Sequence, residues 1–145
     1  MSKIHFCLVK HDPEAGLYGD CLRACVASLL NIEETTDVPH FMHDGCDGNV
    51  AQERLKEWLK GRGLAPFYML FNEDGLAEVL HVMKLLNPGV RYILMGATEE
   101  EEHAIVYAGD ELINDPAWCH SPLVGPSLSN GYWTVLIVVP LAVVQ

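Results

Sequence analysis

The hydrophobic pattern of this chain changes its period near Asn87-Pro88-Gly89, and that change restricts the folds open to it. Upstream, three stretches repeat apolar residues with the period of one helix face. Downstream, four stretches rich in β-branched and aromatic residues predict strands. The predicted helices are residues 21–32, 49–60 and 75–86, and these strands are residues 91–96, 103–109, 111–115 and 132–139. Helices followed by an antiparallel sheet indicate an α+β fold rather than a doubly wound one.

Two more strands are expected within the helical half, one in residues 1–10 (KIHFCLVK) and one in residues 66–71 (PFYMLF). Asp20 and Asp74 stand where helix N-caps would stand. The apolar residues expected to point inward are Leu22, Cys25, Val26, Leu29 and Leu30 in the first helix and Val50, Leu55, Trp58 and Leu59 in the second. The chain contains no repeat, low-complexity tract or linker, so residues 1–145 are expected to form a single domain.

The segment from Ser121 to Gln145 contains no Asp, Glu, Lys or Arg, which raises the question of a membrane span. Its continuous apolar part runs only from about Tyr132 to Val144, and Pro140 interrupts it. A spanning helix needs roughly 20 apolar residues. The segment is therefore expected to be a buried strand, and no membrane partner is expected. The chain also does not open on the basic and apolar pattern of a secretory signal.

Charge and cysteine usage narrow the partners and the compartment. The chain has 20 Asp and Glu against 9 Lys and Arg, a formal charge of −11, and such a surface repels the phosphates of nucleic acids. The five cysteines are odd in number and irregularly spaced, with no C-x-x-C, so neither a disulfide framework nor a zinc ribbon is indicated. Unpaired thiols without a secretion signal predict a reducing compartment, the cytosol.

Cys21 is the first candidate for chemistry. It follows Gly19-Asp20 and opens the first predicted helix, where the positive end of the helix dipole favours a thiolate. The thiolate is the nucleophilic form, and an ordinary thiol supplies little of it at neutral pH. The competing interpretation is that Cys21 is a small buried apolar residue, as free cysteines usually are. Cys25, one turn along the same helix, fits that second interpretation.

The stretch HAIVYAGDELINDP contains the second group of candidates. Two strand patterns joined by Gly109-Asp110 predict a hairpin. Counting from that turn, residue 104 faces 115, and a shift of one residue would place 103 opposite 115. In either register His103 and Asp115 meet at the open end of the hairpin. A carboxylate on one ring nitrogen leaves the other for a nucleophile. The same sequence pattern also fits a solvated histidine that lies beside an acidic loop and has no catalytic role.

GDCLRACVASLL together with HAIVYAGDELINDP resembles the papain-like cysteine peptidases. The closer likeness is to the small papain-like peptidases of bacterial and phage genomes, which are related to bacteriocin-processing leader peptidases. The resemblance covers about a third of the chain. It implies Cys21 as nucleophile, His103 as base and Asp115 as the group that orients the base. It also implies a protein or peptide substrate, no cofactor, and a location in the cytosol of a bacterium or a phage-infected host.

One departure from the family concerns the oxyanion. Members usually carry a Gln a few residues before the nucleophile, and KHDPEAGLYGDC has none. The backbone N–H of Cys21 is expected to supply one donor, and His11 or Tyr18 the other. Asp20 and Trp118 are further candidates for contact with the oxyanion or the substrate. Trp133 is a second aromatic candidate for the lining of a pocket near Asp115, with core packing as the default interpretation.

The residues Glu99 to Glu102 directly precede His103. Four carboxylates are expected to raise the pKa of an adjacent imidazole and to favour a neutral or basic substrate segment. An exposed acidic loop has the same composition, so this interpretation also remains open.

Three functions follow from these patterns. The leading one is a hydrolase that cleaves a peptide, isopeptide or related amide bond through a thioester on Cys21. The second is a weak or inactive papain-like domain that binds a protein, for example in phage takeover of a host or against its defences. The third is a metal-binding interaction module built on His40, His43 and Cys46, although a fourth zinc ligand is not evident.

Overall fold

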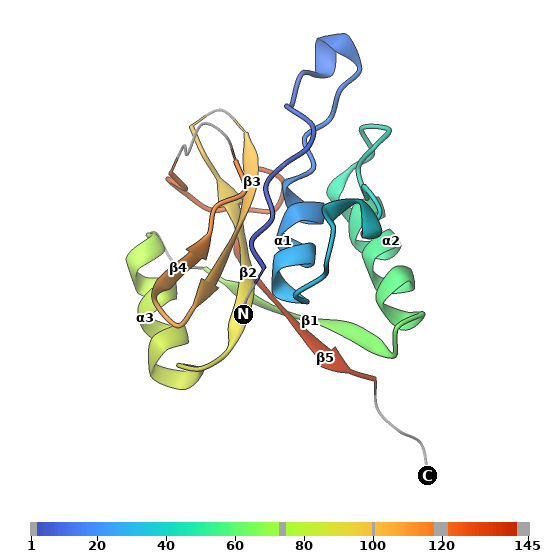
Figure 1. Cartoon of the computed structure of the whole chain (residues 1–145). Helices are drawn as coiled ribbons and strands as arrows, with labels where there is room; N and C mark the ends of the chain where they lie inside the picture. Colours follow the sequence, from blue (N-terminus) through green and yellow to red (C-terminus); the bar gives the residue numbers. More distant parts are fainter. Residues whose placement is uncertain (1–2, 73–74, 100, 118–121, 142–145) are drawn as a thin grey trace.

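The computed structural model describes residues 3–72, 75–99, 101–117 and 122–141. Within them the α-helices are α1 (Cys21–Leu29), α2 (Gly48–Lys60) and α3 (Leu76–Leu86), with short 3₁₀ turns η1 (Pro13–Ala15) and η2 (Thr35–Asp37). The strands are β1 (Leu64–Phe71), β2 (Arg91–Ala97), β3 (Glu102–Ala108), β4 (Glu111–Asn114) and β5 (Trp133–Pro140). The predicted combination of helices with an antiparallel sheet is confirmed (Figure 1).

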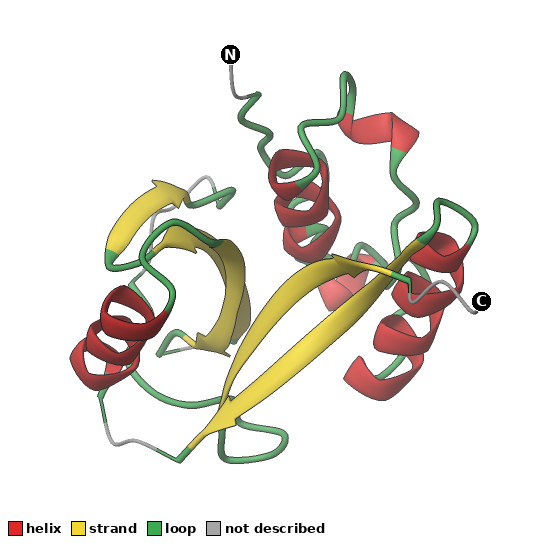
Figure 2. Ribbon diagram, turned by 90° about the horizontal axis from the view of Figure 1, so that it is seen from below, coloured by secondary structure: helices red, strands yellow, loops and turns green. Residues whose placement is uncertain are grey.

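The five described strands form one sheet in the order β1-β5-β2-β3-β4, and every neighbouring pair is antiparallel. The edge strand β1 comes from the helical half of the chain and pairs with β5 along its whole length. This pair forms the long ribbon seen in Figure 2. The other edge is β4, which reaches β3 through a tight turn. The sheet therefore brings the two halves of the sequence together.

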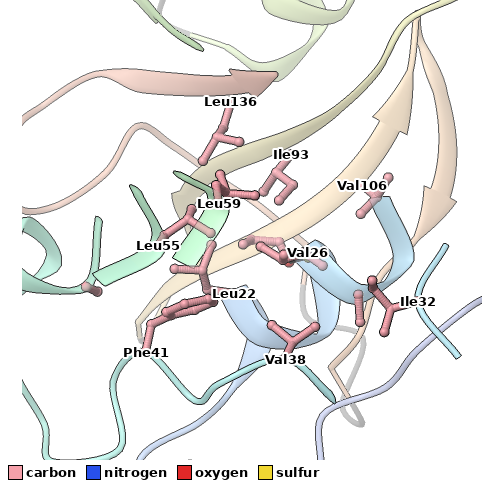
Figure 3. Close-up of a cluster of buried hydrophobic side chains, with 14 residues drawn as sticks. Leu22, Val26, Ile32, Val38, Phe41, Leu55, Leu59, Ile93, Val106 and Leu136 are labelled. Carbon is pink, nitrogen blue, oxygen red and sulfur yellow. Dashed lines mark hydrogen bonds between the residues drawn. The ribbon is translucent and has the colours of Figure 1, made fainter. Parts of the chain in front are cut away.

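Each face of the sheet has its own hydrophobic core. On one face, α1 and α2 pack Leu22, Val26, Leu55 and Leu59 against the sheet residues Ile93, Val106 and Leu136 (Figure 3). On the other face, α3 packs Val79 and Met83 against Tyr92, Leu94, Trp133 and Val135. The alternation of Ile93 with its neighbours Tyr92 and Leu94 between the two cores is the period of a strand covered on both sides. The core with α1 is the one that positions the candidate site.

The opening of the chain differs from the prediction. Residues 3–10 form no strand, although their alternating apolar residues have a strand's period. Their backbone N–H groups bond instead to the side chains of Asn31, Ser28 and Asp20 and to the carbonyl of Pro116. We call residues 3–9 the N-terminal strap. It lies between α1 and the end of β4, and Figure 1 shows it in dark blue beside α1.

The predicted inward faces are correct with one clear exception. Leu22, Cys25 and Val26 of α1 are buried, as are Leu55 and Leu59 of α2, whereas Val50 is 41% exposed. The buried stripe of α2 runs through Ala51, Leu55 and Leu59, and Val50 lies on the outer face of the helix. Asp74, the expected cap of α3, lies outside the described residues. No helix in the described ranges has the length and apolar character needed to cross a membrane.

Candidate active site

Cys21 is the first residue of α1 and is half-buried. The first bond of this helix runs from the N–H of Ala24 to the carbonyl of Asp20, at 3.0 Å. The N–H groups of Cys21 and of the next two residues therefore precede the hydrogen-bonded part of the helix. They give this end of α1 a partial positive charge next to the Cys21 sulfur.

His103 and Asp115 lie together, as the sequence predicts. The ring nitrogen Nε2 of His103 is 2.7 Å from Oδ1 of Asp115, and both side chains are nearly buried, with 6% and 11% of their surface exposed. The N–H of Ala117 donates to the same oxygen of Asp115 at 3.0 Å, which fixes the carboxylate. Because Asp115 occupies Nε2, the nitrogen Nδ1 of His103 is the one left for another partner.

The register that produces this contact is different from the two that counting suggests. The Gly109-Asp110 turn is present, and Gly109 has the positive φ of 59° that such a turn requires. The cross-strand pairs are then Ala108–Glu111, Tyr107–Leu112 and Val106–Asn114. The last pair is shifted by one residue, so β4 contains a bulge at Ile113.

The bulge decides which face Asp115 points to. Without it, Asp115 would continue the strand opposite Ala104, and its side chain would share the face of Ala104 rather than that of His103. Asn114, with the shifted register, is the last paired residue of β4, and one step further along the same register is Ile105, which lies two residues from His103 on the same face. A single extra residue thus turns the carboxylate toward the imidazole.

Asn114, which the sequence reasoning missed, benefits from the same shift. Its amide nitrogen Nδ2 donates to the carbonyl of His5 at 2.7 Å and to Oγ of Ser28, at the far end of α1, at 3.2 Å. Adjacent positions on a strand point to opposite faces, so Asn114 reaches the α1 side while Asp115 reaches His103. Nothing in the local sequence signals this role, because the partners are distant along the chain.

The imidazole of His103 is in an unusual electrostatic environment. Burial opposes its protonation, but the hydrogen bond to Asp115 and interactions with the Cys21 side chain outweigh it and raise the pKa of His103 to about 10. The Cys21 side chain therefore lies close enough to the ring to contribute to this shift. The three side chains come from the start of α1, from the start of β3 and from the residue directly after β4, and α1 and β3 are in contact with each other.

The acidic stretch before His103 acts differently from the expectation. The carboxylate of Glu101 lies 3.5 Å from Nε2 of His11. Glu102 accepts hydrogen bonds from the hydroxyl of Ser127 and the N–H of Ser129. The pKa of His103 is raised, but Asp115 and Cys21 raise it. The prediction that the preceding glutamates are the cause is wrong. Residue 100 lies outside the described part of the chain.

The other described cysteines are in less reactive surroundings. Burial raises the pKa of Cys7 and of Cys25 well above the usual range of a thiol, and nearby Cys21 adds to both effects. Desolvation also raises the pKa of Cys46, against the opposing influence of Arg54. Cys25 donates its S–H to the carbonyl of Ala104 and belongs to the core, as expected of it. Cys119 lies outside the described residues.

The candidates for oxyanion or substrate contact are dispersed. Nδ1 of His11 accepts the N–H of Gly19 at 3.1 Å, so the neutral ring carries its proton on Nε2 and is a donor there. The Tyr18 ring packs against Gly45, where an added Cβ would fall 2.4 Å from a ring carbon. Asp20 is buried, with 1% of its surface exposed, which removes it as a substrate contact. Trp118 lies outside the described residues.

The structure also describes Trp133, a candidate for a pocket lining, and His40, a candidate metal ligand. Trp133 is fully buried, and its ring fills the space that a side chain on Gly96 would occupy, so it does not line an open pocket. Both ring nitrogens of His40 bond to the backbone, Nε2 to the carbonyl of Tyr18 and Nδ1 to the N–H of Met42. In the described part of the chain, no group of three or more His, Cys, Asp or Glu residues is arranged to hold a metal ion.

Comparison with known proteins identifies no relative of this chain. No protein-family model matches the chain, and searches among curated proteins and among solved structures find no match either. A functional argument for this chain therefore depends on its own residues.

Proposed function

We propose that this chain is a papain-like cysteine hydrolase in which Cys21 is the nucleophile, His103 the acid and base, and Asp115 the residue that orients His103. The observation that carries the proposal is the 2.7 Å contact between His103 and Asp115, made on one ring nitrogen while Cys21 interacts with the same ring. A nucleophile, a base and an orienting group in series define this class of site on many folds. The helix that begins at Cys21 and packs on β3 supports the likeness to papain-like enzymes.

The proposed reaction is hydrolysis of an amide bond in two steps. The Cys21 sulfur attacks the carbonyl carbon, and the departing amine takes its proton from His103, which leaves a thioester on Cys21. His103, now neutral, accepts a proton from water as the water attacks the thioester, and the acid is released. Asp115 holds the ring orientation and stabilises the imidazolium in the first step. The N–H of Cys21 at the start of α1 supplies one hydrogen bond to the developing oxyanion.

The substrate class that fits is a protein or peptide segment that is neutral or basic. The chain has a formal charge of −11, and Glu99 and Glu101 are described residues of the loop before His103. Peptide, isopeptide and smaller amide bonds all react by this chemistry. The proposal includes no cofactor and no nucleic acid partner.

The second candidate function is a papain-like domain that binds a protein without efficient turnover. The specific observation in its favour is the absence of a Gln in the residues before Cys21, where the resemblance would place an oxyanion donor. Removal of one such donor typically lowers the rate by ~10²–10³. Thiol labelling alone does not distinguish the hydrolase from the binding domain, because an inactive descendant can keep a reactive thiol. Substrate turnover has to be measured as well.

An electrophilic thiol probe tests the leading proposal. The native protein is treated with a small excess of iodoacetamide, digested, and the modified cysteines are mapped. We expect Cys21 to be modified first, and the His103→Ala variant to lose that selectivity. Modification of Cys7 or Cys119 ahead of Cys21, or protection of Cys21 until unfolding, would rule out the nucleophile. Hydrolysis of a peptide library by wild type but not by Cys21→Ala then distinguishes the enzyme from the binding domain.

A further inference from the structure

Asp20, the residue before Cys21, carries a buried carboxylate for which the proposed reaction has no use. Its side chain has no exposed surface. A carboxylate is costly to bury unless hydrogen-bond donors surround it, so the surroundings of Asp20 must compensate for the lost water. Asp20 does not compensate as an N-cap does, since its side chain makes no bond to the N–H groups of α1.

The donors come from the N-terminal strap instead. Oδ1 of Asp20 accepts the N–H of Leu8 at 2.9 Å and the N–H of Val9 at 3.0 Å. Oδ2 lies 3.2 Å from the same nitrogen of Leu8 and 3.5 Å from the guanidinium of Arg23. The residue directly before Cys21 is thus fixed to the end of the strap by hydrogen bonds to charge, which are stronger than bonds between neutral groups.

The strap also binds the chain on both sides of Asp115. The N–H of Cys7 donates to the carbonyl of Pro116 at 3.0 Å, and the amide of Asn114 donates to the carbonyl of His5 at 2.7 Å. The N–H of His5 bonds to Oγ of Ser28 at 2.9 Å, near the far end of α1. The strap therefore connects the segment that carries Asp115 with both ends of the helix that carries Cys21.

We propose that Asp20 is a positioning residue that, through the strap, holds Cys21 at its working distance from the His103–Asp115 pair. The inference rests on the proposed function, because it assigns Asp20 a part in that same site. Asp20 touches neither substrate nor the reacting atoms. Its carboxylate ties the strap to the residue directly before Cys21, whereas the bonds of Asn114 and His5 to Ser28 reach only the far end of α1. Small errors in the position of a nucleophile cost large factors in rate.

The test compares Asp20→Ala and Asp20→Asn with wild type and with His103→Ala. The measurement is the alkylation rate of Cys21 by iodoacetamide from pH 5 to 9, on protein shown by circular dichroism to be folded. Among the described residues, Cys21 influences the pKa of His103, Cys7 and Cys25, and all three side chains are kept in both Asp20 variants. Asp12→Asn is the matched control, because Asp12 is an exposed acid in the neighbouring loop.

We expect Asp20→Ala to slow alkylation at pH 6 by about 10²-fold, to the level of His103→Ala, since misplacement by an ångström has an effect of that size. Asp20→Asn keeps the acceptor Oδ1, so its alkylation rate is expected to lie between those of wild type and Asp20→Ala. Asp12→Asn is expected to match wild type. A role confined to stability would lower the unfolding temperature of Asp20→Ala but leave the pH profile of the folded protein unchanged, which would overturn the inference.

A second pair of variants applies even if Asp20→Ala does not fold. Leu8 is exposed, so Leu8→Pro removes one of the two strap N–H groups that Asp20 accepts without removing core packing, and Leu8→Ala keeps both. Leu8→Pro is expected to reproduce the slowed alkylation, and Leu8→Ala to match wild type. Equal behaviour of the two variants would contradict the inference. If Cys21 of wild type is alkylated no faster than Cys21 of His103→Ala, the proposed function fails. If wild type is faster than His103→Ala but the Asp20 and Leu8 variants match wild type, only the positioning role is contradicted.

Discussion

Nε2 of His103 lies 2.7 Å from Oδ1 of Asp115, although β4 ends one residue before that carboxylate. The contact exists because the bulge at Ile113 turns Asp115 onto the face of His103. Deletion of Ile113 would restore the regular register and move Asp115 to the opposite face. We expect this deletion to remove the excess reactivity of Cys21 at pH 6, measured by iodoacetamide alkylation of the folded protein.

Ile113→Ala is the control for that deletion. It removes the same side chain, which packs against the core of α1, but keeps the extra residue and hence the register. We expect it to lower stability by about 1–3 kcal/mol, because Ile113 is only half-buried, and to leave the reactivity of Cys21 intact. If the deletion and Ile113→Ala react alike, the bulge is not what directs Asp115.

The three residues of the proposed triad are expected to differ in the cost of their removal. Cys21→Ala should abolish turnover, and His103→Ala should lower it by about 10²–10⁴-fold, the usual contribution of a general acid and base. Asp115→Asn should cost less than His103→Ala, because the amide oxygen still accepts from Nε2 and keeps the ring oriented. The kinetic constants of the three variants on one peptide substrate check this order. Equal, complete loss in all three would indicate that the carboxylate charge itself is required.

The stability of the protein is expected to fall as the pH rises above neutrality. The pKa of His103 is about 10 in the folded protein, above the value near 6.5 of an unfolded chain. Below pH ~6.5 both states are protonated and the stabilisation is fully present. As the pH rises toward 10, the unfolded state releases its proton first, so it binds fewer protons and the free energy of unfolding decreases.

Urea unfolding at pH 6, 8 and 10 measures this loss of stability. The Cys21→Ala background should be included, because it separates the contribution of Asp115 from that of the thiol. His103→Gln in that background should flatten the dependence between pH 6 and 10. A slope that is unchanged by His103→Gln would mean that the imidazole is not held in its charged form by the fold.

Periodicity predicted most of the fold but not the contacts that determine the site. The helix at Cys21 and the hairpin of His103 follow from local patterns of apolar residues and from the Gly109-Asp110 turn. The strap has a strand's alternation, but its donors bond to Asp20 and Ser28, which lie more than ten residues away along the chain. Whether these backbone N–H groups bond to a neighbouring strand or to side chains depends on tertiary packing, and a local sequence pattern carries no information about that packing.

The contact of His103 with Asp115 was predictable from the sequence, but the geometry that produces it was not. His103 and Asp115 were expected to meet because they end two adjacent strands. The bulge that brings them together depends on the packing of Ile113 and on the bonds of Asn114 to the strap and to α1. Likewise the position of Asp20 before α1 suggested a cap, and only the folded chain gives its carboxylate another set of donors.

The acidic loop gives a prediction about substrates. Glu101 faces His11 rather than His103, so the loop is expected to act on the substrate through its field and not on the base. Single exposed charges at ~4 Å interact by only ~1 kcal/mol in water, but several together bias encounter. We expect peptides with Lys beside the cleavable bond to react faster than matched Glu peptides, and salt to reduce the difference. The control is Glu99→Gln with Glu101→Gln, which should also reduce it, and a preference for Glu peptides would contradict the proposed substrate class.

The most direct test of the central claim is the rate at which iodoacetamide modifies Cys21 at pH 6 in wild type and in His103→Ala. If Cys21 and His103 form a thiolate–imidazolium pair, the wild-type sulfur reacts at this pH and the variant reacts about 10²-fold more slowly or worse. Mapping of the modified peptide and an unchanged circular dichroism spectrum ensure that the same sulfur is compared in the same fold. Equal rates for Cys21 in the two proteins would show that His103 does not activate it, and the account of this chain as a cysteine hydrolase would be wrong.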